Sequence, residues 1–101
     1  MNGDQVRDRI DAAMSYLQSE GFSDVEDPSV LQKDAFDSRV YTITAEFEGA
    51  RKFLKISYAW LEERSARAVT KFLVDRDIGR SLKQPDTQRC TIEASGLLNW
   101  Q

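Results

Sequence analysis

Alternation of apolar and polar residues is clearest over residues 40–60, where two runs rich in β-branched and aromatic residues flank residues 48–51. Such alternation is typical of strands, and a glycine between two of them indicates a tight hairpin turn. We predict a two-residue turn at Gly49 and Ala50, with glycine in the first central position. The predicted core-facing pairs are Ala45 with Leu54, Ile43 with Ile56, and Tyr41 with Tyr58.

Outward positions of this hairpin are mostly polar, as expected of an antiparallel sheet with one face in water. Phe53 interrupts that polar face. Because helices on one side of a small sheet leave its other face open, we expect no helix to cover Phe53. A large apolar residue there indicates contact either with another part of the chain or with another protein.

Helical periodicity marks two further regions. Apolar residues recur at helical spacing from about Asp4 to Glu20, and Gly21 follows where a helix commonly ends. A second helical region begins near Leu61 and includes a short final helix that ends before Pro85. These two regions therefore supply the helices of the predicted fold.

The C-terminal part alternates again, from about Gln88 to Ser95, which predicts a last strand. The residues after Gly96 are unusually apolar for a terminal segment, so we expect them to dock, either across the open sheet face or against another protein. Residues 23–38 are the least regular stretch, and they fit either a short strand or a helical turn.

Together these elements predict a single α+β domain over residues 1–101, in the order α-β-β-α(-α)-β. We expect a three-stranded antiparallel sheet with the helices packed on one face. The length of 101 residues and the hydrophobic content of 41% are ordinary for one globular domain.

The chain lacks several kinds of catalytic chemistry. It contains no histidine and a single cysteine, Cys90, so it holds neither a histidine-based triad nor a cysteine zinc site. Cys90 falls at an inward strand position, where a small core residue is the simpler interpretation. Carboxylates distant in sequence can still meet in space, and the pattern does not test that. We predict a non-enzymatic protein with no catalytic residue, no metal and no cofactor.

Location follows from the absence of two signals. Neither a signal peptide nor a membrane-spanning run is recognisable, and the longest apolar run is 58–61. A single cysteine cannot form an internal disulfide. We therefore expect a soluble cytoplasmic protein that makes no membrane contact.

Charge is unevenly distributed about a formal net value of −3. Residues 1–50 contain eleven acids and four bases, whereas residues 51–101 contain six acids and ten bases. Bases on the second helical region suggest nucleic-acid or other polyanion binding as an alternative function, although a solvated helix face is the simpler interpretation. The predicted anion-binding residues are Arg64, Arg67, Lys71 and Arg80.

The predicted order of elements is similar to that of the type II KH domain. In that family a Gly-X-X-Gly loop between two helices clamps a nucleic-acid backbone. The corresponding junction here reads Asp77-Ile78-Gly79-Arg80, which has one of the two glycines and an acid that would repel phosphate. The similarity is one of topology and not of residues.

The apolar tail and Phe53 favour a contact function. We predict a small interaction or regulatory module that acts through the open sheet face and the apolar C-terminal tail. Its partner is another protein or a second copy in a homodimer, and nucleic acid is the weaker alternative. No motif identifies the partner or the process. The predicted protein-contact residues are Phe53, Leu97, Leu98 and Trp100.

Overall fold

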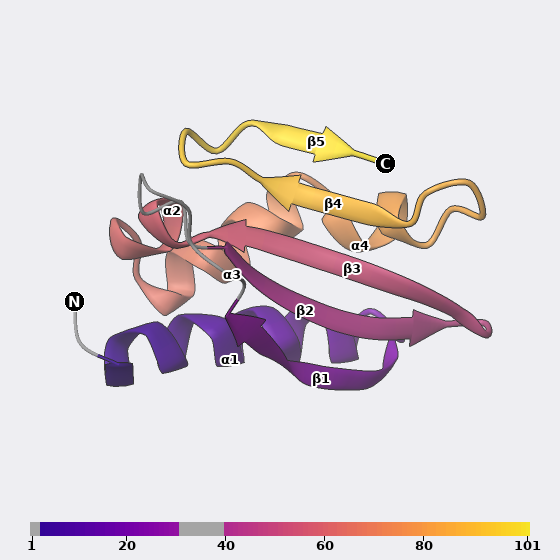
Figure 1. Cartoon of the computed structure of the whole chain (residues 1–101), viewed down its shortest axis with the longest axis horizontal. Coiled ribbons are helices and arrows are strands. Elements are labelled where there is room, and N and C mark those ends of the chain that lie inside the picture. Colours follow the sequence, from indigo (N-terminus) through magenta and orange to yellow (C-terminus); the bar gives the residue numbers. More distant parts are fainter. Residues whose placement is uncertain (1–2, 31–39) are drawn as a thin grey trace.

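The computed structural model describes residues 3–30 and 40–101, which form one mixed sheet with helices packed against it (Figure 1). The elements are α1 (Gly3–Ser19), β1 (Ser23–Val30), β2 (Val40–Phe47), β3 (Ala50–Ser57), α2 (Tyr58–Glu62), α3 (Ala66–Asp75), α4 (Ile78–Leu82), β4 (Arg89–Ile92) and β5 (Leu98–Trp100). The α+β class is confirmed. Of the irregular stretch 23–38, the first part is strand β1, and residues 31–38 lie outside the described residues.

The sheet has five strands in the order β1-β2-β3-β4-β5, so the prediction of three strands is wrong. β3 and β4 are parallel, whereas each of the other neighbouring pairs is antiparallel. A hairpin cannot join parallel strands, and here α2, α3 and α4 form the crossover between β3 and β4. The predicted all-antiparallel sheet and the predicted element order are therefore also wrong.

The turn of the β2–β3 hairpin lies one residue earlier than predicted. Phe47 pairs with Ala50, so Glu48 and Gly49 are the central residues, with φ angles of 52° and 83°. Two positive φ angles define a type I′ turn, which follows the twist of the strands and accepts glycine in its second central position. Each β2 residue therefore pairs with a β3 residue two positions earlier than predicted, and a shift of two leaves the same side chains inward. Ile43 now pairs with Leu54, and Tyr41 with Ile56.

The core lies between the sheet and the helices. Its members are buried side chains from the inward faces of β2, β3 and β4 together with those of all four helices. The largest include Ile10, Leu17, Ile43, Leu54, Ile56, Trp60, Leu61, Leu73, Ile78, Leu82 and Ile92.

Lys52 is a charged residue on the inward face of β3, and it is only 3% exposed. Its Nζ donates hydrogen bonds to the backbone carbonyls of Gln84, at 2.9 Å, and Thr87. Buried polar groups need such partners. The bonds hold the loop that leads from α4 into β4, so they fix where β4 begins.

A close contact places α4 against α1. The Gly79 backbone N–H donates to the Tyr16 hydroxyl at 2.7 Å, and a Cβ on Gly79 would lie 2.7 Å from a Glu20 oxygen. A side chain at residue 79 would therefore displace Glu20 and crowd the Tyr16 hydroxyl. Burial raises the pKa of Tyr16 above its ordinary value of 10.0, and the nearby carboxylates of Glu20 and Asp77 act in the same direction.

The predicted last strand is shorter than expected, and the apolar tail forms a strand of its own. β4 ends at Ile92, and the chain turns through Gly96, whose φ of 91° favours glycine. β5 then returns antiparallel to β4. The tail therefore docks within the chain, at the edge of the sheet beside β4 and not across the open face.

Candidate protein-contact site

β5 is the last strand of the sheet. The backbone N–H and C=O groups of its successive residues point alternately toward β4 and away from it. Gln101 and Arg89 exchange backbone hydrogen bonds of 2.8 and 2.9 Å, and Glu93 N donates to Leu97 O at 2.9 Å. Bonding alternates along an antiparallel pair. The backbone groups of Leu98 and Trp100 therefore point away from β4, along an edge on which no described strand follows.

The side chains of Leu98 and Trp100 lie on the helix-covered side of the sheet. Their partners across the ladder are Ile92 and Cys90, and both partners are fully buried. Leu98 packs against the core, whereas Trp100 remains 38% exposed. No residue of β5 itself is charged. The β5 edge thus combines free backbone groups with an apolar side-chain surface.

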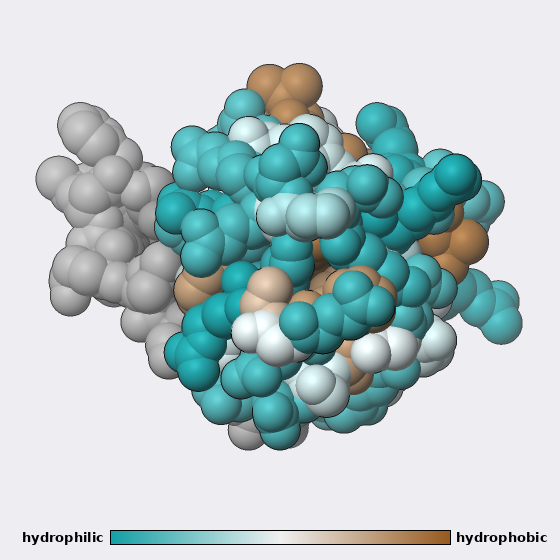
Figure 2. Space-filling view, turned by 90° about the vertical axis from the view of Figure 1, so that its right-hand side faces the viewer, coloured by the Kyte–Doolittle hydropathy of each residue, from teal (hydrophilic) through white to brown (hydrophobic). Residues whose placement is uncertain are grey.

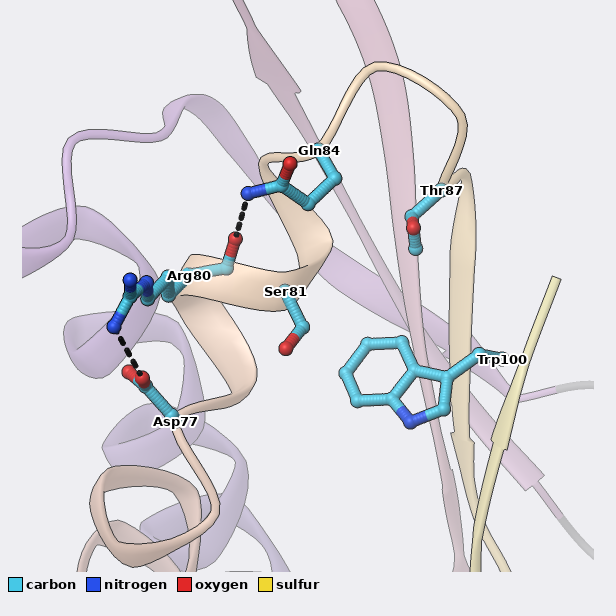
Figure 3. A pocket seen from close by; sticks show the side chains of 6 residues that line it. All are labelled: Asp77, Arg80, Ser81, Gln84, Thr87 and Trp100. Atoms are coloured by element: carbon cyan, nitrogen blue, oxygen red, sulfur yellow. Dashed lines mark hydrogen bonds and ion pairs between the residues drawn. The ribbon is translucent and has the colours of Figure 1, made fainter.

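A groove of about 520 Å³ separates Trp100 from α4 (Figure 3). In Figure 3 the indole of Trp100 projects from β5 toward α4, and Ser81 points into the space between them. Arg80 turns its guanidinium away from Trp100 toward Asp77, at 3.6 Å. The groove is therefore aromatic on the β5 side and polar on the α4 side. Its lining residues are Asp77, Arg80, Ser81, Gln84, Thr87 and Trp100.

The opposite edge of the sheet, β1, is built differently. Ser23 pairs with Glu46, Glu26 with Thr44 and Ser29 with Thr42, with a register shift at each step. β1 therefore carries two irregularities of the bulge type within its eight residues. Bulges twist an edge and interrupt its regular hydrogen-bonding row.

Charge and proline also protect β1. Asp24 and Glu26 are exposed, and the Glu26 carboxylate accepts a hydrogen bond of 3.1 Å from the Thr44 hydroxyl. Pro28 lies within the strand and has no backbone N–H to donate. Bulges, charges and proline are the features by which sheets prevent another strand from adding at an edge.

Phe53 lies on the sheet face opposite the helices. It pairs with Thr44 across β2–β3 and with Arg89 across β3–β4. A shallow hollow of about 240 Å³ surrounds it, lined also by Thr42, Lys55 and Arg89. The four predicted contact residues therefore do not form one surface. Leu98 and Trp100 share the helix side, Phe53 faces the other way, and Leu97, 65% exposed, precedes β5 in the turn.

Hydrophobic surface is not extensive at the end of the molecule that carries the β2–β3 turn. Figure 2 shows this end as mostly hydrophilic, with hydrophobic side chains in small separate areas. Scattered apolar residues of this kind are normal on a protein surface and indicate no docking site by themselves. The β5 edge is distinguished by its backbone rather than by a broad apolar patch.

The predicted anion-binding residues are largely engaged with other groups. Arg64 donates to the Trp60 carbonyl at 3.0 Å and lies 4.6 Å from the centre of its ring. Lys71 pairs with Asp75 at 2.7 Å, and Arg80 pairs with Asp77, while Arg67 is exposed. Nearby carboxylates reduce the positive field that would attract a polyanion. Polyanion binding stays a prediction.

Cys90 lies under β5, paired with Trp100 and fully buried. Burial raises the pKa of its thiol from 9.0 to about 12, because the thiolate would lose its hydration. The thiol is therefore protonated at neutral pH, as expected of a core residue. Within residues 3–30 and 40–101, no three acidic, cysteine or histidine side chains gather as metal ligands do. None of the described helices has the length and apolar character to cross a membrane.

Sequence reasoning identified Leu98 and Trp100. It missed that their backbone N–H and C=O groups point outward, and it missed the α4 side of the groove. The pairing of β5 with β4 depends on a turn at Gly96 that the alternating pattern did not locate. No protein-family model matches the chain, and neither a curated protein nor a solved structure is detectably similar to it.

Proposed function

We propose that the protein is a non-enzymatic interaction module that binds an extended segment of a protein chain along β5. The observation that supports this is the unprotected backbone of Leu98 and Trp100 on an uncharged edge. An added strand would bond to these outward N–H and C=O groups, as in other recognition by strand addition.

The side chains of β5 determine what kind of segment fits. Residues of the added strand that face the helix side would lie against Leu98 and Trp100 and beside the α4 groove. Those that face the other side would lie near Asn99, whose amide donates to the Glu93 carboxylate. The expected segment therefore alternates, with apolar residues toward the helices and polar residues away from them.

Backbone hydrogen bonds to an added strand would contribute measurably to the free energy of binding. Each hydrogen bond contributes a net stabilisation of about 0.5–1.5 kcal/mol, and burying an exposed tryptophan adds to it. Such a contact is weak to moderate in affinity. It suits a regulatory module better than a permanent assembly.

A displayed library of random peptides tests this function. Selection on the immobilised wild type should enrich peptides of alternating apolar and polar residues. Leu98→Pro removes an outward N–H without removing a bond to β4, so it should weaken binding of those peptides at least about tenfold.

Val74→Ala is the matched control, because Val74 is an exposed apolar residue (57%) on α3. It should leave peptide binding unchanged. Circular dichroism and thermal unfolding check that Leu98→Pro remains folded. If no peptide is enriched, or if binding is indifferent to Leu98→Pro, strand addition at β5 is wrong.

A further inference from the structure

We infer that the segment that pairs with β5 is β5 of a second copy, so that two chains form one continuous sheet about a twofold axis. This inference rests on the proposed function and names the partner for the same edge.

The two edges of the sheet first restrict how copies can associate. Pairing of β5 with β1 of another copy would repeat without limit and produce a filament. The acids, register shifts and Pro28 of β1 oppose that arrangement. Pairing of β5 with β5 uses one open edge from each copy and closes as a dimer.

Geometry then selects a register. The outward backbone groups belong to Leu98 and Trp100, so these residues must form the hydrogen-bonded pairs of an antiparallel contact. With Asn99 on the twofold axis, Leu98 pairs with Trp100 of the partner subunit, and the reverse pair forms by symmetry. This register uses every residue of β5, and each apolar side chain meets a different apolar side chain.

On the helix side, this register produces an uninterrupted apolar row. Cys90 and Trp100 of one chain would be followed by Leu98 of the partner subunit and then Ile92 of the partner subunit. Cys90 and Ile92 are fully buried in their own cores. The dimer would therefore join the two cores through β5, whose Trp100 is 38% exposed in the single chain.

Charges on the opposite face agree with the same register. Arg89 aligns with Gln101 across β4–β5, and Glu93 aligns with Leu97. Across the twofold axis, Gln101 aligns with Leu97 of the partner subunit. A row across the two chains therefore runs from Arg89 through Gln101 to Leu97 of the partner subunit and Glu93 of the partner subunit. Its two ends have opposite charges, and no like charges are brought together.

Neighbouring registers lose these features. A shift by two residues pairs Trp100 with Trp100, or Leu98 with Leu98, and leaves part of β5 without a strand opposite it. It also moves Arg89 out of the row that contains Glu93 of the partner subunit. Complementary charge and complete pairing therefore favour the arrangement centred on Asn99.

Sedimentation equilibrium over a range of concentrations tests the inference. The wild type should show a monomer–dimer equilibrium. Leu98→Pro removes an outward N–H, and Trp100→Lys places a charge opposite Leu98 of the partner subunit. Each should raise the dimer dissociation constant at least about tenfold, since each change occurs twice in a symmetric contact. Val74→Lys, the same kind of change at an exposed site on α3, should leave the constant unchanged.

The outcomes separate the inference from the proposed function. A dimer weakened by both β5 variants and not by Val74→Lys supports the inference. A dimer that persists in Trp100→Lys overturns it, even where Leu98→Pro is poorly folded. A wild type that stays monomeric while selected peptides bind at β5 overturns the inference and leaves the proposed function standing. A monomer that also binds no peptide contradicts both.

Discussion

The two edge strands of this sheet are built in opposite ways. β1 has register shifts, exposed Asp24 and Glu26, and a proline, whereas β5 is regular, uncharged and partly apolar. An unprotected strand edge favours pairing with other chains, and natural proteins usually protect against it. The contrast shows that protection is built into one edge and absent from the other.

The two edges differ more in the regularity of their backbone hydrogen-bonding groups than in their side chains. β1 and β5 each expose polar groups, but only on β5 do successive outward groups follow a regular ladder. A regular row can accept a second strand without rearrangement, whereas a bulged row cannot. On our proposal, strand addition therefore takes place at β5.

Detaching β5 from β4 should have the largest effect on the stability of the protein. Asn99→Pro removes an N–H that points toward β4, because Asn99 pairs with Thr91 between two bonded pairs. We expect the free energy of unfolding to fall by about 1–3 kcal/mol. Cys90, now uncovered, should react with a thiol reagent at neutral pH faster than in the wild type. Denaturant titration and the labelling rate measure the two effects.

Leu98→Pro is the adjacent comparison for that experiment. Its N–H points outward, so its loss should leave the labelling rate of Cys90 nearly as slow as in the wild type. Equal labelling rates in the two variants would show that the assignment of inward and outward groups is incorrect.

Opening the protected edge should have the next largest effect. The triple variant Asp24→Asn, Glu26→Gln, Pro28→Thr removes charges and restores an N–H on β1, and asparagine tolerates the positive φ of residue 24. The register shifts remain, but β1 then carries one acid in place of three and no proline. A rearranged β1 can pair with β5 of another copy, so sedimentation velocity should reveal species larger than a dimer. Adding Leu98→Pro should stop that growth. Growth that continues despite Leu98→Pro would mean that β5 takes no part.

Alkaline pH should have a moderate effect, centred on the thiol beneath β5. The unfolded thiol ionises near 9.0, but burial raises the pKa of native Cys90 to about 12. Above pH 9.0 the unfolded state loses its proton first, so the free energy of unfolding falls as pH rises toward about 12. Urea titrations at increasing pH should show this decline.

Cys90→Ala separates this contribution from that of Tyr16, whose raised pKa acts in the same direction at higher pH. The variant should lose the part of the decline that begins near 9.0. An unchanged pH profile in Cys90→Ala would mean that the thiol is not protected under β5.

Phe53→Ala should have the smallest effect on association. Phe53 faces away from the helices and lies on β3, so it does not contribute to pairing along β5. Sedimentation equilibrium should give the wild-type dissociation constant. A weakened dimer would indicate that the open face, predicted from the sequence as part of the contact, joins the interface after all.

Local patterns predicted much of this structure. The helix over α1, the inward residues Ile43 and Ile56, and the docking of the tail follow from periodicity and from the apolar content of single segments. The turn was misplaced by one residue because Gly49 can occupy either central position of a tight turn. A shift of two in the partners leaves the faces unchanged, so that error did not affect the core.

Non-local pairing was not predictable in the same way. β1 contains a proline and acids that are rare in strands, and it is held in the sheet by β2. The parallel direction of β4 depends on how three helices return the chain to β3. The candidate site depends on these pairings, because the contrast between the edges needs β1 in the sheet and β5 can be an edge strand only beside β4.

Amide hydrogen exchange, followed residue by residue at low and high protein concentration, tests the central claim most directly. Asn99 and Gln101, bonded to β4, should be protected at both concentrations, while Leu98 and Trp100 should gain protection only at high concentration. β1 should show no such dependence. Exchange at Leu98 and Trp100 that stays fast at every concentration would contradict pairing of β5 with a second copy.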